Sequence, residues 1–115
     1  MKSGKIWGET EPLLVNAFCE AHRIKAKAGG YCSMHKHEYK TNCFHVISGE
    51  LKIIVEKADY ALTDITILGP GDTMEVPPGE FHRFEALTDV DALEIYYPTP
   101  IGADIVRRDH GAATG

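Results

Sequence analysis

Three histidines at two places in the chain have the spacing of metal ligands. His35 and His37 flank a single residue, so in an extended segment both side chains point the same way. Two imidazoles on one face supply two ligands, and a usable site needs a third from elsewhere. His82 is the candidate, because it follows the turn-forming run 77–81 at the start of another expected strand.

Imidazole ligands restrict which metal such a site would bind. Three of them suit zinc, iron(II), nickel or copper better than magnesium or calcium, which prefer oxygen ligands. A three-histidine centre also leaves positions open for water or substrate, as catalytic sites do and closed structural sites do not. We therefore predict one divalent transition metal (zinc, iron, nickel or manganese) bound by His35, His37 and His82.

The segments that would carry these histidines are short and are separated by glycine and proline. Between the turn signals lie runs of β-branched and aromatic residues, and no stretch shows a long amphipathic helical period. The expected strands are Leu14–Phe18, His22–Ala26, Tyr31–His35, Cys43–Ile47, Leu51–Glu56, Asp64–Leu68, Thr73–Val76, His82–Ala86 and Ala92–Tyr97. Many short strands at near-regular spacing predict an all-β sandwich or barrel.

The totals fit one domain. The 115 residues are 43% hydrophobic and 25% charged, with a net charge of −5, and no basic tract that would favour nucleic acid or an anionic membrane. No apolar run approaches the ~18 residues of a membrane span. Three cysteines without CxxC spacing and a polar N-terminus predict reduced thiols in the cytoplasm. We expect a barrel core over about 13–97 and a tail over 98–115.

One row of cations needs a separate interpretation. Arg23, Lys25 and Lys27 alternate along an expected strand and therefore share one face. Such a row is typical of a solvated face or of an edge strand protected against aggregation. If the face were turned inward, the three side chains would instead form a row that binds anions.

The segment around the first two histidines resembles the first sequence motif of the cupin family. That motif has the form G-x5-H-x-H-x3,4-E-x6-G. Here Gly29 is followed after five residues by His35 and His37, after four more by Asn42, and after six more by Gly49. The resemblance implies that position 42 is the fourth metal ligand, which is a glutamate in most cupins. A neutral amide oxygen is a weaker ligand than a carboxylate, so Asn42 either binds the metal weakly or bonds to a metal-bound water.

The second cupin motif, G-x5-P-x-G-x2-H-x3-N, is matched further along the chain. Gly71 is followed after five residues by Pro77 and Gly79, then by His82, with Ala86 in place of the final asparagine. The two motifs together cover about residues 29–86. They imply a double-stranded β-helix, the jelly-roll barrel of the cupins, here as a single domain.

A finer resemblance concerns both ends of the chain. The opening Ile6-Trp7-Gly8 and the run 102–107 look like the cupin domain of type II mannose-6-phosphate isomerases, which usually carry glutamine at the position of His35. The resemblance implies a metal-bound sugar or sugar phosphate that exchanges protons between neighbouring carbons. A carboxylate base would move the proton, and Glu38 and Glu94 are the candidates.

Two other functions stay open at this point. Some thiol dioxygenases, which are also cupins, hold iron(II) with three histidines and no carboxylate, and the ligand set here matches theirs. A small cupin could also bind a carbohydrate or other small molecule without catalysis. In each case we expect a homodimer, with Trp7 and the early strands at a two-fold interface, because pairing would cover edge strands.

Overall fold

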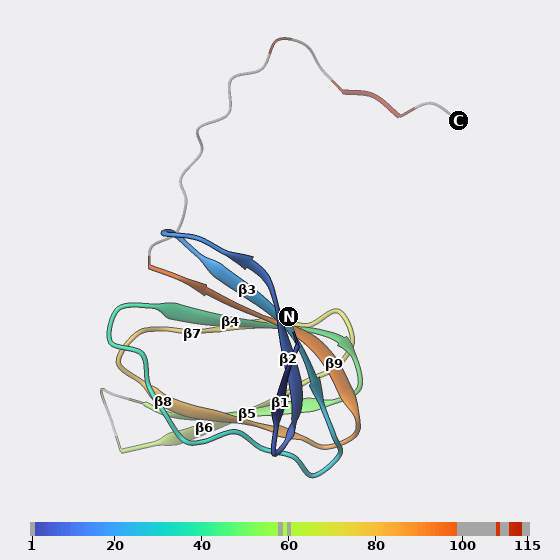
Figure 1. Ribbon diagram of the computed structural model, residues 1–115. Coiled ribbons are helices and arrows are strands. Elements are labelled where there is room, and N and C mark those ends of the chain that lie inside the picture. Colours follow the sequence, from blue (N-terminus) through green and yellow to red (C-terminus); the bar gives the residue numbers. More distant parts are fainter. Residues whose placement is uncertain (1, 58, 60, 99–107, 109–110, 114–115) are drawn as a thin grey trace.

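The computed structural model describes residues 2–57, 59, 61–98, 108 and 111–113, and within these ranges the chain forms strands and no helix (Figure 1). The strands are β1 (Ser3–Lys5), β2 (Gly8–Val15), β3 (Glu20–Ala26), β4 (Thr41–Ser48), β5 (Leu51–Glu56), β6 (Thr63–Leu68), β7 (Thr73–Val76), β8 (Phe81–Ala86) and β9 (Val90–Tyr97). No helix in the described part of the chain is long and apolar enough to cross a membrane.

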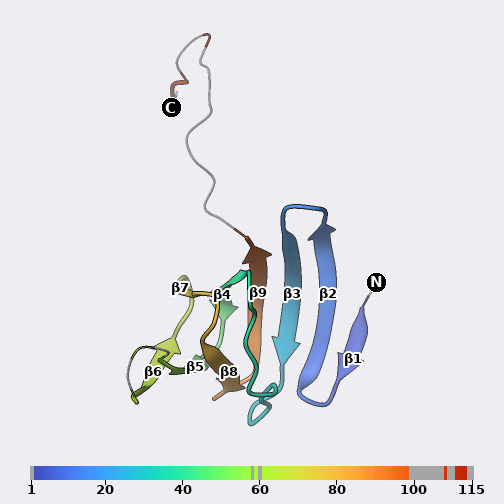
Figure 2. The same ribbon diagram turned by 90° about the vertical axis from the view of Figure 1, so that its left-hand side faces the viewer.

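The strands form two antiparallel sheets that face each other. One has the order β1-β2-β3-β9-β4-β7, and the other has the order β6-β5-β8. Figure 2 shows the larger sheet as a row of neighbouring strands from β1 to β4, with the smaller sheet beside it. The predicted all-β barrel in a single domain is confirmed.

The core lies between the sheets and follows the alternation of side chains along each strand. In β5 the buried positions are Leu51, Ile53 and Val55, every second residue, as expected for a strand with one solvated face. The buried core consists of Ile24, Ala26, Phe44, Val46, Leu51, Ile53, Val55, Leu68, Val76, Phe84, Ala86, Val90 and Ala92. Trp7 packs against this core, with its ring 4.9 Å from that of Phe84 in an edge-to-face arrangement.

Polar side chains continue three of these inward rows at one end of the barrel. Asn42 shares its face of β4 with buried Phe44, His82 shares its face of β8 with Phe84, and Glu94 lies on the inward face of β9. The register pairs Val55 with His82, Phe44 with Glu94 and Asn42 with Tyr96. The alternation that builds the core therefore also brings these polar groups into the interior.

The first expected strand, Leu14–Phe18, is wrong. Strand β2 begins at Gly8 and ends at Val15, and β1 pairs with it from Ser3, so sheet pairing begins before residue 13. The chain turns at Asn16, whose Oδ1 accepts hydrogen bonds from the backbone N–H groups of Phe18 and Cys19 at 2.8 and 2.9 Å. Such a side-chain bond competes with a sheet ladder and favours a turn.

The expected strand Tyr31–His35 is also wrong as a regular element. The segment runs antiparallel to β8, but only Tyr31 and His35 form bridges, to Glu85 and His82. Between them the Sγ of Cys32 accepts the backbone N–H of Phe84 at 3.3 Å. A sulfur therefore takes the place of a carbonyl in the ladder, and the segment stays irregular while following β8 closely.

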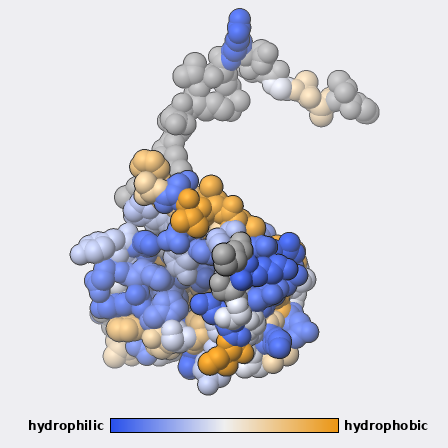
Figure 3. Space-filling view, in the orientation of Figure 1, coloured by the Kyte–Doolittle hydropathy of each residue, from blue (hydrophilic) through white to orange (hydrophobic). Residues whose placement is uncertain are grey.

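The outward faces carry most of the charge. Arg23 forms a bidentate ion pair with Asp91 across β3 and β9, and Lys25 and Lys27 are exposed, so the cation row faces outward. Figure 3 shows hydrophilic side chains over much of one face and an apolar cluster above it, where the β2–β3 hairpin ends. Apolar residues exposed on that hairpin are Leu13, Leu14, Val15 and Phe18.

Gly49, in the turn between β4 and β5, is expected to tolerate no side chain. Its φ is +86°, and a Cβ there would lie 2.1 Å from the carbonyl oxygen of Asp89. Gly49→Ala should lower the free energy of unfolding by about 2–5 kcal/mol, measured by urea denaturation, because backbone strain and overpacking add. Gly71→Ala is the control, since Gly71 has the same φ and a Cβ there would meet no atom of the described residues within 4 Å. Equal losses in the two variants would show that the contact with Asp89 does not matter.

Candidate metal centre

The three predicted histidines lie together at the polar end of the barrel. Ring centroids are 4.7 Å apart for His35 and His82, 5.1 Å for His35 and His37, and 5.5 Å for His37 and His82. One nitrogen of each ring lies within 4.8 Å of the other two. The cluster has the donor type and the spacing of a three-histidine metal centre.

Two of the histidines are oriented by backbone carbonyls. The Nδ1 of His35 lies 2.7 Å from the carbonyl oxygen of Ser33, and the Nδ1 of His82 lies 3.0 Å from that of Glu80. A carbonyl oxygen only accepts, so each Nδ1 carries the proton and donates. The Nε2 atoms are thereby left with free lone pairs, which is the usual arrangement behind a metal-binding imidazole.

The main chain holds the two histidine segments together. The backbone N–H of His35 donates to the carbonyl of His82 at 3.0 Å, and the N–H of His82 donates back at 2.8 Å. The N–H of Gly79 donates to the carbonyl of His37 at 2.8 Å. The turn before β8 and the loop before β4 are therefore joined by backbone bonds at the positions that carry the imidazoles.

Asn42 completes a set of acceptors that fits a cation. Its side chain is fully buried, and its Oδ1 lies 2.9 Å from the Nε2 of His82. Because His82 donates from Nδ1, both of these atoms are acceptors, and a shared metal ion would satisfy both. The Nε2 of His37 is also buried and has no hydrogen-bond partner among the described residues. Buried acceptors of this kind are expected to have a partner, and a divalent metal fits them.

The protonation of the cluster also favours metal binding. Burial lowers the pKa of His37 and of His82, and the neighbouring His35 lowers both further. The two imidazoles are therefore neutral at neutral pH, which is the form that binds a metal. The thiol of Cys32 differs, because burial raises its pKa to about 11 and keeps it protonated.

The predicted carboxylates have opposite placements. Glu94 is buried, and burial raises its pKa, although the neighbouring Tyr96 and Asn42 side chains oppose the shift. Glu38 is exposed, and its carboxylate pairs with the Nζ of Lys36 at 3.4 Å. The structure therefore brings Glu94, but not Glu38, into the barrel interior.

A cavity of about 290 Å³, called the inner cavity below, is lined by both Glu94 and His35. Its lining includes Lys5, Trp7, His22, His35, Glu94 and Tyr96. The ring of Tyr96 lies 5.0 Å from that of His37, and burial together with the nearby Glu94 raises the pKa of the Tyr96 phenol. The neutral phenol and the carboxyl group thus lie beside the candidate metal ligands.

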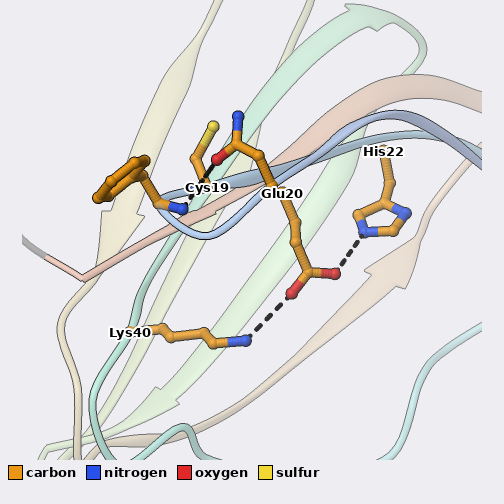
Figure 4. Close-up of polar contacts among 6 residues, drawn as sticks. Cys19, Glu20, His22 and Lys40 are labelled. Carbon is orange, nitrogen blue, oxygen red and sulfur yellow. Dashed lines mark hydrogen bonds and ion pairs between the residues drawn. The ribbon is translucent and has the colours of Figure 1, made fainter.

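His22 belongs to neither histidine motif of the sequence, but the structure places it in the lining of the inner cavity. The Nε2 of His22 lies 3.3 Å from one oxygen of Glu20, and Lys40 donates to the other oxygen at 3.1 Å (Figure 4). Lys40 and His22 lower the pKa of Glu20, so the carboxylate stays ionised. The alternation of side chains along a strand could have indicated this position, because His22 lies two residues before buried Ile24 and shares its face of β3.

Solved structures share this fold at low sequence identity. KdgF from Halomonas sp. matches with a TM-score of 0.74 and 19% identity, over 87% of this chain and 89% of its own. A protein of unknown function from Streptococcus pyogenes matches with a TM-score of 0.67 and 14% identity, over 80% and 75%. Oxalate decarboxylase from Bacillus subtilis, described for its Mn(II) centres, matches with a TM-score of 0.77 and 17% identity, over 89% of this chain but 28% of its own.

Sequence comparisons give two further results. A search of curated proteins finds no match, so the resemblance to mannose-6-phosphate isomerases stays a prediction, and its segment 102–107 lies outside the described residues. The model of the cupin domain family matches residues 22–96, which span β3 to β9 and contain all three histidines. The chain therefore belongs to the cupin domain family.

Proposed function

We propose that the protein is a metal-dependent isomerase that moves a proton between neighbouring carbons of a small hydroxycarbonyl compound, such as a sugar. The observation that carries this proposal is Glu94, a buried carboxyl group in the same cavity as His35. A divalent metal bound there would supply Lewis-acid polarisation of a carbonyl or hydroxyl oxygen. The chain itself would supply the base, the orientation of the substrate and the exclusion of water.

Glu94 has the properties expected of the base. A buried carboxylate with a raised pKa is a stronger proton acceptor than an exposed one, and its pKa lies nearer the working pH. Its oxygen would take the proton from one carbon and return it to the neighbouring carbon, while the hydroxyl proton moves to the former carbonyl oxygen, so the reaction needs no other reactant. Tyr96 stays protonated and donates its hydroxyl hydrogen bond to Glu94, so it would orient the base. Glu38 is not favoured, because it pairs with Lys36 in solvent.

We also propose Asn42 as a fourth, neutral ligand. Replacing it with leucine, which has nearly the same shape, would remove one oxygen donor and leave the three histidines. Asn42→Leu is expected to weaken metal affinity about tenfold, the lower end of the range for groups that support metal ligands. Competition with a chromogenic chelator measures this change for zinc, iron, nickel and manganese. Unchanged affinity for all four metals would show that Asn42 does not contact the ion.

Exchange of solvent deuterium tests the isomerase directly. The protein, loaded in turn with each of the four metals, is incubated in D2O with a set of hexoses and hexose phosphates. Proton transfer would replace the hydrogen on the carbon next to the carbonyl, and its NMR signal would disappear without loss of the sugar. Loaded protein that exchanges no hydrogen in any member of the set would overturn the proposal.

A dioxygenase is the second candidate because no carboxylate among the described residues belongs to the cluster. His35, His37, His82 and Asn42 all offer neutral donors. Oxygen uptake by the iron-loaded protein, without deuterium exchange, would favour this candidate. Metal binding with neither reaction would favour a cupin that binds a small molecule without turnover.

A homodimer remains part of the proposal. Strands β1 and β6 are sheet edges, and the β2–β3 hairpin carries the exposed apolar residues described above. Association would cover both kinds of surface. Light scattering on the eluted protein is expected to give twice the 12.7 kDa mass of the chain. A mass of one chain at micromolar concentration would contradict it.

A further inference from the structure

A second cavity adjoins the inner one at the surface of the barrel. This outer cavity has a volume of about 680 Å³, and its lining includes Lys5, Trp7, Lys27, Tyr31, Cys32 and Arg83. Lys5, Trp7, Cys32 and Ser33 line both cavities. A ligand that fills the outer cavity therefore comes into contact with the residues that border the metal centre.

The charge of the outer cavity is opposite to that of the chain. Three cations, Lys5, Lys27 and Arg83, contribute to its lining, and no carboxylate of the described residues does, although the chain has a net charge of −5. Neither Lys5 nor Lys27 forms an ion pair with any residue that the structure describes. Clefts lined by one sign of charge attract ligands of the other sign.

Arg83 is held in place while part of its hydrogen-bonding capacity is unused. Its guanidinium lies 5.1 Å from the centre of the Tyr31 ring, and one terminal nitrogen lies 3.6 Å from an oxygen of Glu85. Glu85 also pairs with Lys52 at 3.4 Å, so one carboxylate is shared between two cations. The Nε of Arg83 is buried without a hydrogen-bond partner in the described part of the chain. The excess positive charge of the cavity fits an anion.

We propose that the outer cavity binds an anionic group, a phosphate or a carboxylate, carried by the compound whose other end lies in the inner cavity. The cations would hold the charged end, and Trp7 would lie against the part of the ligand that joins the two cavities. The identity of the reacting end rests on the proposed function, whereas the anion site rests only on the outer cavity. The substrate would then be an acidic or phosphorylated hydroxycarbonyl compound.

Trp7 provides the measurement, because it is the only tryptophan of the chain and lines both cavities. The full chain with its bound metal is titrated with inorganic phosphate while tryptophan emission is recorded. The same titration is run with glucose 6-phosphate, glucuronate and glucose, which differ in the group at C6. A saturable change with a charged sugar and a much weaker response to glucose are expected. The charged sugar with the lower half-saturating concentration shows whether phosphate or carboxylate is the group recognised.

Two lysines form a matched pair of variants. Lys27 lines the outer cavity, whereas Lys25, two residues before it, does not. Lys27→Ala is expected to raise the half-saturating phosphate concentration about tenfold, the effect of one charge-assisted hydrogen bond, and Arg83→Gln is expected to act similarly. Lys25→Ala makes the same change in net charge and should leave the value unchanged.

Several results would overturn the anion site. The site is rejected if Lys25→Ala and Lys27→Ala weaken phosphate binding equally, or if neither Lys27→Ala nor Arg83→Gln weakens it. It is also rejected if glucose binds as tightly as both charged sugars. The outcome is separate from that of the isomerase proposal. Saturable anion binding without deuterium exchange would keep the anion site and reject the isomerase. Deuterium exchange in neutral sugars, without a change in Trp7 emission on addition of phosphate or a charged sugar, would keep the isomerase and reject the anion site.

Discussion

Replacing His82 with alanine is expected to remove stoichiometric metal from the purified protein. The change leaves two imidazoles and one amide, and metal affinity should fall by more than about 100-fold, because even the partners that orient metal ligands are worth 10–100-fold. The cluster would also lose the ligand whose Nδ1 is fixed by the Glu80 carbonyl and whose Nε2 faces Asn42. Elemental analysis of untagged protein measures the change.

The control for this variant is His45→Ala. His45 lies on β4, three residues after Asn42, and its Nδ1 bonds to the Thr73 hydroxyl at 2.7 Å on the opposite face. This variant should keep its metal. Because His82 is buried, His35→Ala provides a second test with less risk to the core. Near-stoichiometric metal in folded His82→Ala and His35→Ala would reject the three-histidine centre and both enzyme proposals.

Replacing Glu94 with glutamine should reduce the rate of deuterium exchange about 1,000-fold, within the range for loss of a general base. Glutamine keeps the shape of the side chain and cannot accept the proton. Metal content should be unchanged, because Glu94 is not among the clustered ligands. NMR exchange rates and elemental analysis on the same sample separate these two effects.

The comparison variant is Glu38→Gln, the same chemical change at the other predicted carboxylate. Glu38 is exposed and pairs with Lys36, so its loss is expected to leave the exchange rate close to that of the parent protein. A large loss in Glu38→Gln with none in Glu94→Gln would reverse the assignment of the base. Equal rates in all three proteins would indicate that neither carboxylate transfers the proton.

The positions of the metal histidines could be predicted because short-range features determine them. His35 and His37 face the same side, with ring centroids 5.1 Å apart, as their i, i+2 spacing predicts, although the segment that carries them is irregular. The turn containing Gly79, whose φ is +86°, sets the start of β8 and the position of His82. Glycine and proline mark such turns in the sequence itself.

Features that depend on distant pairing could not be predicted in the same way. The inward placement of Glu94 depends on the register of β9 with β4 and β3. This register could not be predicted, because a single sequence does not show which strands pair. The strand Leu14–Phe18 was mistaken because the apolar run crosses a turn made by the Asn16 side chain. The exposure of Glu38 likewise depends on the path of the loop after His37, for which alternation gives no rule.

The backbone bonds between the His35 and His82 segments have a consequence for how this centre can change. The three histidine positions are spaced by main-chain hydrogen bonds that do not involve the imidazole side chains, whereas the proposed fourth donor is the side chain at position 42. A single substitution there, such as Asn42→Glu, would exchange a neutral donor for an anionic one while the scaffold keeps its shape. Metal preference and reactivity can therefore diversify, by evolution or by design, separately from the sequence requirements of folding.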